Sequence, residues 1–187
     1  MLNFSLLYIV SIVVVFQCLF LVIGNQISYA IELPYNTYAG NGFRIDYPIG
    51  WVAIENTFMA PVNIFAPFCC GEVSVFSFNK SELHPLLTTD TLAYYVHLIP
   101  LPFLNEKVTS YLPSQISGKE IDNHEAYELT YTGKLGKDSF KSTELGTIIG
   151  NKAYILVYRA SSDSYNFIHP IAETIMDSFQ HTVSRSR

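Results

Sequence analysis

Hydrophobic and polar residues alternate along this chain with the period of a β-strand in several short runs. In the first, residues 43–47, three apolar side chains alternate with Arg44 and Asp46, and Pro48 and Gly50 then interrupt the pattern. Turn-forming residues separate the runs, so the first four are expected to form an antiparallel meander. The expected strands are residues 43–47, 51–55, 62–66, 73–79, 115–121, 126–132, 139–149 and 153–160.

Two other segments carry apolar residues at the spacing of an amphipathic helix. The first begins near Thr88-Thr89-Asp90, whose side chains can cap exposed amide groups, and ends before Pro100. The second follows Ser161-Ser162-Asp163. Because Pro170 lacks an amide hydrogen, we expect this helix to start just before Pro170 or to bend there.

Two of the expected strands, residues 73–79 and 153–160, are apolar on both faces, so both of their faces should be buried. The two helices are the segments available to cover them. The order of strands, helix, strands and helix predicts an α+β fold in which helices flank an antiparallel sheet.

The first 30 residues differ from the rest of the chain. All 11 basic and 16 acidic side chains follow residue 31, and residues 4–23 are uncharged and mostly apolar. About 20 such residues can cross a ~30 Å hydrocarbon layer as a helix. Ser28-Tyr29-Ala30 fits a signal-peptide cleavage site, whereas the length of the apolar run and the lack of a basic start favour a retained anchor. Both alternatives place the folded part outside the cytoplasm.

These observations divide the chain into four parts. Residues 1–30 are the expected hydrophobic helix, a signal peptide or membrane anchor, and residues 31–41 are a linker. Residues 42–182 fit one domain, and residues 183–187 are a C-terminal tail. If the leader is not cleaved, residues 4–23 provide the membrane association.

The formal net charge of −5 comes without any block of basic residues. This composition argues against nucleic acid and anionic lipid surfaces as the main partners.

The three cysteines do not form a disulfide framework. Cys18 lies in the apolar leader, and Cys69 and Cys70 are adjacent, a spacing that rarely forms a bridge without strain. The pair is either two small residues in a bend before Gly71, a candidate thiol site for an intermolecular bridge, or half of a metal site.

Asn79-Lys80-Ser81 matches the acceptor pattern for N-glycosylation just after an expected strand. Asn79 is therefore a candidate glycosylation site, conditional on export to a compartment that carries out this modification.

No segment carries a convincing reaction centre. His124-Glu125-Ala126-Tyr127-Glu128 begins like a zinc-protease motif, but Glu128 stands where the second His should be. The segment is also an expected strand, in which positions four apart are separated by ~13 Å and cannot share one ion. No Gly-x-Ser-x-Gly motif, phosphate loop or dinucleotide fingerprint occurs. We expect no catalytic residues, no metal, no cofactor and no enzymatic activity.

The segment Gly42-Phe43-Arg44-Ile45-Asp46-Tyr47-Pro48-Ile49-Gly50-Trp51 resembles the opening strand and turn of PsbP-like proteins. Residues 126–131, 153–158 and 176–179 are similar to the late strands and the final helix of that family, so the resemblance spans roughly residues 36–180. It implies an α-β-α sandwich around an antiparallel sheet, and members that act by binding. The chain departs from the photosynthetic members: it has no twin-Arg leader, and residues 31–41 are too short for their docking extension. No metal-binding residue is carried over.

These lines lead to one functional expectation and one alternative. The chain is expected to be an exported or membrane-anchored, non-catalytic binding or assembly factor for an extracytoplasmic or membrane complex. Its protein partner is expected in or near the membrane, and the apolar loop containing Leu101, Phe103 and Leu104 is the candidate docking site. The alternative is an exported protein that binds a small ligand or a metal in a cleft beside the sheet, with Cys69 and Cys70 taking part.

Overall fold

The computed structural model describes residues 34–57, 60–84, 86–98 and 108–182. The chain divides into two units, Met1–Leu33 and Pro34–Arg187, and every described residue lies in the second. The expected hydrophobic helix and the C-terminal tail lie outside the described residues. None of the helices described here is long and apolar enough to cross a membrane.

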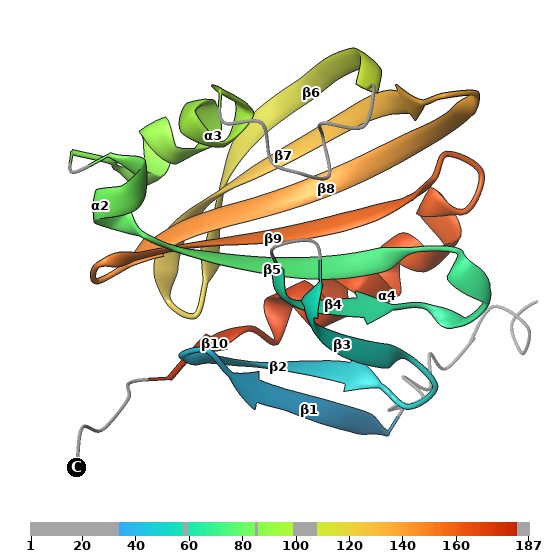
Figure 1. Cartoon of the computed structure of the whole chain (residues 1–187), viewed down its shortest axis with the longest axis horizontal. Helices are drawn as coiled ribbons and strands as arrows, with labels where there is room; N and C mark the ends of the chain where they lie inside the picture. Colours follow the sequence, from blue (N-terminus) through green and yellow to red (C-terminus); the bar gives the residue numbers. More distant parts are fainter. Residues whose placement is uncertain (1–33, 58–59, 85, 99–107, 183–187) are drawn as a thin grey trace, which may run out of the picture. The chain divides into compact units, whose positions relative to one another are not determined.

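The central element is a seven-stranded antiparallel sheet with the order β3-β4-β5-β9-β8-β7-β6 (Figure 1). Two meanders, β3 to β5 and β6 to β9, are joined by pairing between β5 and β9. Asp122 and Asn123 form the two-residue turn between β6 and β7, and both have the positive φ that such hairpins favour. The strands are β3 (Val52–Thr57), β4 (Ala60–Phe65), β5 (Glu72–Asn79), β6 (Val108–Ile121), β7 (His124–Leu135), β8 (Asp138–Ile149) and β9 (Lys152–Ser161).

A second, three-stranded sheet has the order β1-β2-β10, built from Tyr35–Gly40, Phe43–Pro48 and Gln180–His181. It corrects two expectations. Residues 43–47 and 51–55 do not belong to one meander, because the chain changes sheets at Gly50, whose φ is +96°. Part of the expected linker 31–41 is also strand β1, which pairs along the whole of β2.

Two helices cover opposite faces of the large sheet. α4 (Tyr165–Asp177) contacts β9, β5, β8 and β2, whereas α3 (Thr89–Leu98) contacts β7 and β8. Figure 1 shows α3 in front of the sheet and α4 behind it. The expected α+β sandwich, with helices on both sides of an antiparallel sheet, is therefore confirmed in the described residues. Two short helices, η1 (Pro67–Cys69) and α2 (Lys80–Leu83), flank β5.

The apolar alternation of the central strands produces two separate cores. Tyr154, Leu156 and Tyr158 of β9 face α4, and the intervening Ile155 and Val157 belong to the core on the α3 side. This matches the expectation that residues 153–160 are buried on both faces. Trp51, 7% exposed, lies in the α4-side core.

The start of α4 differs from the expected position. The helix begins at Tyr165, so Pro170 lies inside it. Tyr165 and Ile168 are both buried against the sheet. Their packing stabilises the first turn, although Pro170 cannot donate a helical hydrogen bond.

Candidate functional site

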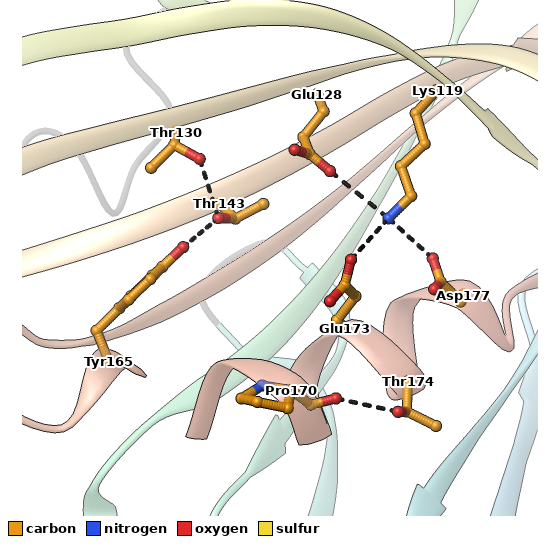
Figure 2. A network of polar contacts seen from close by, with 9 residues as sticks. All are labelled: Lys119, Glu128, Thr130, Thr143, Tyr165, Pro170, Glu173, Thr174 and Asp177. Atoms are coloured by element: carbon orange, nitrogen blue, oxygen red, sulfur yellow. Dashed lines mark hydrogen bonds and ion pairs between the residues drawn. The ribbon is translucent and has the colours of Figure 1, made fainter. Parts of the chain in front are cut away.

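A lysine surrounded by three carboxylates connects α4 to the edge of the sheet (Figure 2). The Nζ atom of Lys119, on β6, lies 3.1 Å from Asp177 Oδ1, 3.4 Å from Glu173 Oε1 and 3.5 Å from Glu128 Oε2. Partial burial alone would lower the pKa of Lys119, but the hydrogen bond to Asp177 and the three negative charges outweigh it and raise the pKa. The ammonium group is therefore held charged as a link between β6, β7 and α4.

A second polar chain on the same face starts at the first residue of α4 (Figure 2). The Tyr165 hydroxyl is hydrogen-bonded to Thr143 Oγ1, which lies 3.2 Å from Thr130 Oγ1. The Tyr158 hydroxyl donates to the carbonyl oxygen of Tyr165 at 2.9 Å. Burial raises the pKa of Tyr165 and of Tyr158. Both hydroxyls therefore stay protonated, and the chain holds the start of α4 on the sheet.

On the opposite face, a carboxylate is fully buried among apolar side chains. Glu144 of β8 has no exposed surface, and its Oε1 atom accepts a hydrogen bond of 2.5 Å from the Tyr127 hydroxyl. Burial raises the pKa of Glu144 to about 7, although the Tyr127 bond favours the charged form and opposes the shift. Glu144 is therefore divided between its protonated and charged forms near neutral pH.

The absence of a side chain at Gly146 makes the Tyr127 contact possible. Gly146 is the cross-strand partner of Tyr127, and a Cβ atom at Gly146 would lie 2.1 Å from the Tyr127 ring. The ring therefore lies directly over the glycine, which brings its hydroxyl to Glu144 two residues away on β8.

Two buried atoms, one in this carboxylate and one near it, have no hydrogen-bond partner within the described part of the chain. They are the second carboxylate oxygen, Glu144 Oε2, and Ser142 Oγ, two residues earlier on the same face of β8. The cross-strand neighbour of Ser142 is Arg159 on β9. Buried polar atoms without partners are uncommon in folded proteins and carry a desolvation cost. The α3 side of the sheet thus contains polar groups that the described fold does not satisfy.

A pocket of about 350 Å³ lies at the end of the sheet next to Arg159. Phe65 and Phe140 provide apolar walls, and Cys70 lies on the turn between β4 and β5. Arg159 forms an ion pair with Glu72 across the two strands, with 2.5 Å between the guanidinium and the carboxylate oxygen. The pocket combines an apolar surface with one paired charge, an arrangement suited to an apolar group that carries a polar end.

The turn next to this pocket holds Phe68 in an unusual position. Phe68 has a φ of +61° and is 99% exposed. The left-handed region is rare for a bulky residue. The thiol of Cys70 donates to the carbonyl oxygen of Pro67 at 2.8 Å, which closes the turn around it. The turn therefore presents an aromatic ring to solvent instead of burying it.

The structure places the other predicted site residues apart from one another. Cys70 is partly exposed and lines the pocket, whereas the side chain of Cys69 lies outside what the structure describes. Asn79 is exposed at the end of β5, and its Nδ2 atom donates to Glu82 Oε1 at 2.6 Å. The docking loop with Leu101, Phe103 and Leu104 also lies outside the described residues, so it stays a prediction.

The zinc-like motif does not assemble a metal site in this part of the chain. Among the described residues, no three His, Cys, Asp or Glu side chains lie close enough together to hold a metal ion. Glu128 binds Lys119 instead, and His124 Nδ1 lies 2.6 Å from the carbonyl oxygen of Asp122.

Sequence reasoning offered a cleft beside the sheet near Cys69 and Cys70 as an alternative but could not give its walls, and it missed the buried carboxylate. The pocket needs the β4–β5 turn and the end of β9, which lie far apart in the sequence. Glu144 could have been found, because it alternates in phase with Phe140 and Ile148 in the expected strand 139–149. A charged residue at such a position is the signal.

Comparison with solved structures identifies the architecture. A cyanobacterial PsbP (CyanoP) from Synechocystis sp. PCC 6803 aligns with a TM-score of 0.55 at 15% identity, covering 82% of this chain and 96% of that one. The chain has a PsbP-like fold. LpqN from Mycobacterium tuberculosis, described as involved in cell envelope biogenesis, shares this fold with a TM-score of 0.53 at 11% identity, covering 81% of this chain and 92% of that one.

The Saccharomyces cerevisiae Ran-binding protein Mog1p also shares the PsbP-like fold. It aligns with a TM-score of 0.55 at 8% identity, covering 80% of this chain and 96% of that one. No protein-family model and no curated protein sequence matches this chain. At these identities the PsbP-like fold is the shared property, so the function has to be argued from the residues of this chain.

Proposed function

We propose that this protein is an exported or membrane-anchored, non-catalytic binding factor whose folded unit docks a protein of a membrane or extracytoplasmic complex. The observation that carries the proposal is the pocket at the end of the sheet, with the apolar walls of Phe65 and Phe140 beside the Glu72–Arg159 ion pair. An apolar side chain of the partner enters this pocket, and a polar group next to it meets the ion pair. Mog1p, with the same fold, is described as a Ran-binding protein, which supports a binding role.

The apolar leader supports a location outside the cytoplasm for this binding function. Residues 4–23 form an uncharged apolar run, and all charged side chains follow it. The folded unit therefore works outside the cytoplasm, at a membrane if the leader is retained. Its partner is in or near that membrane.

Site-specific crosslinking on intact membranes tests the binding role. A photoreactive amino acid replaces Ser139 or Ser161, two exposed residues that line the pocket. The matched control replaces Ser81, an exposed serine on α2, at the other end of β5. We expect links from the pocket positions to a second protein and few links from position 81. Recovery of only self-links, with the protein free in the soluble exported fraction, would refute the proposal.

The pocket also favours a second candidate function, the binding of a small ligand. Its volume of about 350 Å³ lies within the range of small-molecule sites, and Cys70 supplies a thiol on its wall. A metal form of this hypothesis needs Cys69 as well. A thermal shift with divalent metals, measured before and after changing both Cys69 and Cys70 to Ser, tests that form. The absence of a shift with any metal would remove it.

We also propose that Asn79 carries a glycan when the protein is exported to a compartment that attaches one. Asn79 is exposed and caps α2 through Glu82. Ser81→Ala removes the acceptor pattern but keeps both residues of the cap. We expect this variant to lose the glycan mass without losing stability, and an unchanged mass would contradict the proposal.

A further inference from the structure

Large exposed apolar side chains gather at one end of the folded unit. Phe68 is 99% exposed, Phe167 is 82% exposed, and Ile49 and Val52 are 61% and 58% exposed. Tyr35, 43% exposed, completes the set, which we call the apolar end. Ile54, 44% exposed, lies farther along β3, and Leu86, 79% exposed, lies at the other end.

The strand register shows that these residues share one end. Val52 is the cross-strand partner of Phe65, Phe65 of Glu72, and Glu72 of Arg159. Phe68 lies on the turn between Phe65 and Glu72, and Phe167 lies in the first turn of α4, directly after β9 ends.

Tyr35 starts β1 opposite Pro48, the end of β2, and Ile49 follows in the turn to β3. Figure 1 shows the β4–β5 turn, the start of α4 and the start of β1 on the right, and α2 on the left. Leu86 follows α2, which begins where β5 ends. The eight residues of β5 therefore separate it from the apolar end by roughly 25 Å.

The apolar end is also where the chain enters the folded unit. Pro34 is the first described residue, and its carbonyl oxygen accepts a hydrogen bond of 2.9 Å from the amide of Ile49. Residues 24–33 connect Pro34 to the apolar run of residues 4–23, and such a tether reaches at most ~35 Å when fully extended. A retained anchor would therefore hold the apolar end within reach of the bilayer.

We propose that the apolar end docks on the surface of the lipid bilayer that holds residues 4–23. Phe68 and Phe167 insert into the boundary between headgroups and acyl chains, where aromatic side chains are favoured. The net charge of −5 gives no general attraction to anionic lipids, so apolar insertion drives the contact and zwitterionic lipids suffice. The inference goes beyond the proposed partner site, with which it shares the retained anchor and the β4–β5 turn, because Phe68 lies between the pocket residues Phe65 and Cys70.

Quenching of tryptophan fluorescence by brominated lipid chains tests this docking. The single tryptophan is first removed by the substitution Trp51→Phe, and the full chain is inserted into phosphatidylcholine vesicles. Three variants then carry one tryptophan each: Phe68→Trp, Phe167→Trp and the matched control Leu86→Trp. We expect at least about twofold stronger quenching at positions 68 and 167 than at position 86, because apolar side chains insert only ~5–10 Å into the boundary.

Amide hydrogen exchange of the unmodified chain provides a second measurement that needs no substitution. In lipid nanodiscs compared with detergent, residues 66–71 and 164–168 should exchange more slowly, while residues 86–88 should not change. Equal quenching at positions 68, 167 and 86 would overturn the proposal. Shielding of positions 68 and 167 only in native membranes, and not in pure lipid, would also overturn it and would assign the apolar end to a protein partner. Neither outcome depends on the crosslinks at Ser139 and Ser161.

Discussion

The buried carboxylate of Glu144 should make the stability of this protein depend on pH in a defined direction. Its pKa rises from an ordinary value of 4.5 to about 7 in the folded protein. Between these two values the unfolded chain has lost the proton while the folded chain retains it. The free energy of unfolding therefore falls as pH rises from about 4.5 to about 7, and it stays low above that range.

The size of the effect follows from the shift. Each pKa unit corresponds to about 1.4 kcal/mol, so the difference between 4.5 and about 7 is worth about 3 kcal/mol. Glu144 is fully buried, so solvent does not screen this contribution. A loss of this size is a large part of the total stability of a typical domain, about 5–15 kcal/mol.

Glu144→Gln tests the reasoning because it removes the titration but keeps an oxygen that can accept the Tyr127 hydrogen bond. Any cost of burying the new amide group is the same at every pH. Chemical unfolding is followed by the fluorescence of Trp51, the single tryptophan, across pH 4.5 to 8. We expect the wild type to lose about 3 kcal/mol more than the variant across this range.

The matched control is Glu120→Gln, which changes an exposed carboxylate on β6. All other titrating groups are common to the proteins, so they cancel in the comparison. The control should keep the pH dependence of the wild type. Equal pH dependence of wild type and Glu144→Gln would refute the reasoning, because the folded-state shift would then not exist.

Three further substitutions test other parts of the structure by thermal or chemical unfolding. Gly146→Ala should destabilise the fold by about 1–3 kcal/mol because its Cβ would meet the Tyr127 ring, whereas Gly118→Ala, with open space around it, should cost far less. Lys119→Met leaves three carboxylates facing one another and should lower the free energy of unfolding by about 1 kcal/mol. This destabilisation should shrink at high salt, and a destabilisation that does not depend on salt would contradict its origin in ion pairs. Phe68→Asn should stabilise the fold by up to about 1 kcal/mol, since Asn tolerates the left-handed backbone better; a less stable variant would show that the ring packs on the fold.

Local patterns in the sequence were sufficient to predict most elements and both layers of the sandwich. The runs 73–79 and 153–160 are apolar on alternate positions of both faces, so helices had to lie on each side of the sheet. The capping residues around Thr88 indicated where α3 begins, and Thr88 Oγ1 accepts a hydrogen bond of 3.4 Å from the amide of Thr91. The start of α4 was less well predicted, because this helix begins at Tyr165 without a side-chain cap.

The change of sheet between β2 and β3 could not be predicted in the same way. A turn with Pro48 and Gly50 between two alternating runs is typical of a hairpin. Instead Phe43 stacks on Phe179, with 5.5 Å between the ring centroids, and β10 pairs with β2. These partners lie more than a hundred residues apart in the sequence, so only the folded chain shows that β2 belongs with the end of α4.

The polar groups on the two faces of the sheet differ in whether they have hydrogen-bond or ion-pair partners, and this difference bears on function. On the α4 face, Lys119 pairs with Asp177 and Tyr165 is hydrogen-bonded to Thr143, and these contacts attach α4 to the sheet. On the α3 face, Ser142 Oγ and Glu144 Oε2 have no partner among the residues that the structure describes, and Ser142 is the cross-strand neighbour of Arg159, which lines the pocket. An apolar residue at position 142 would remove a desolvation cost, so stability alone gives no reason for a serine there. Polar groups that are costly to the isolated fold and lie next to a pocket are expected where binding, and not stability, determines the residue.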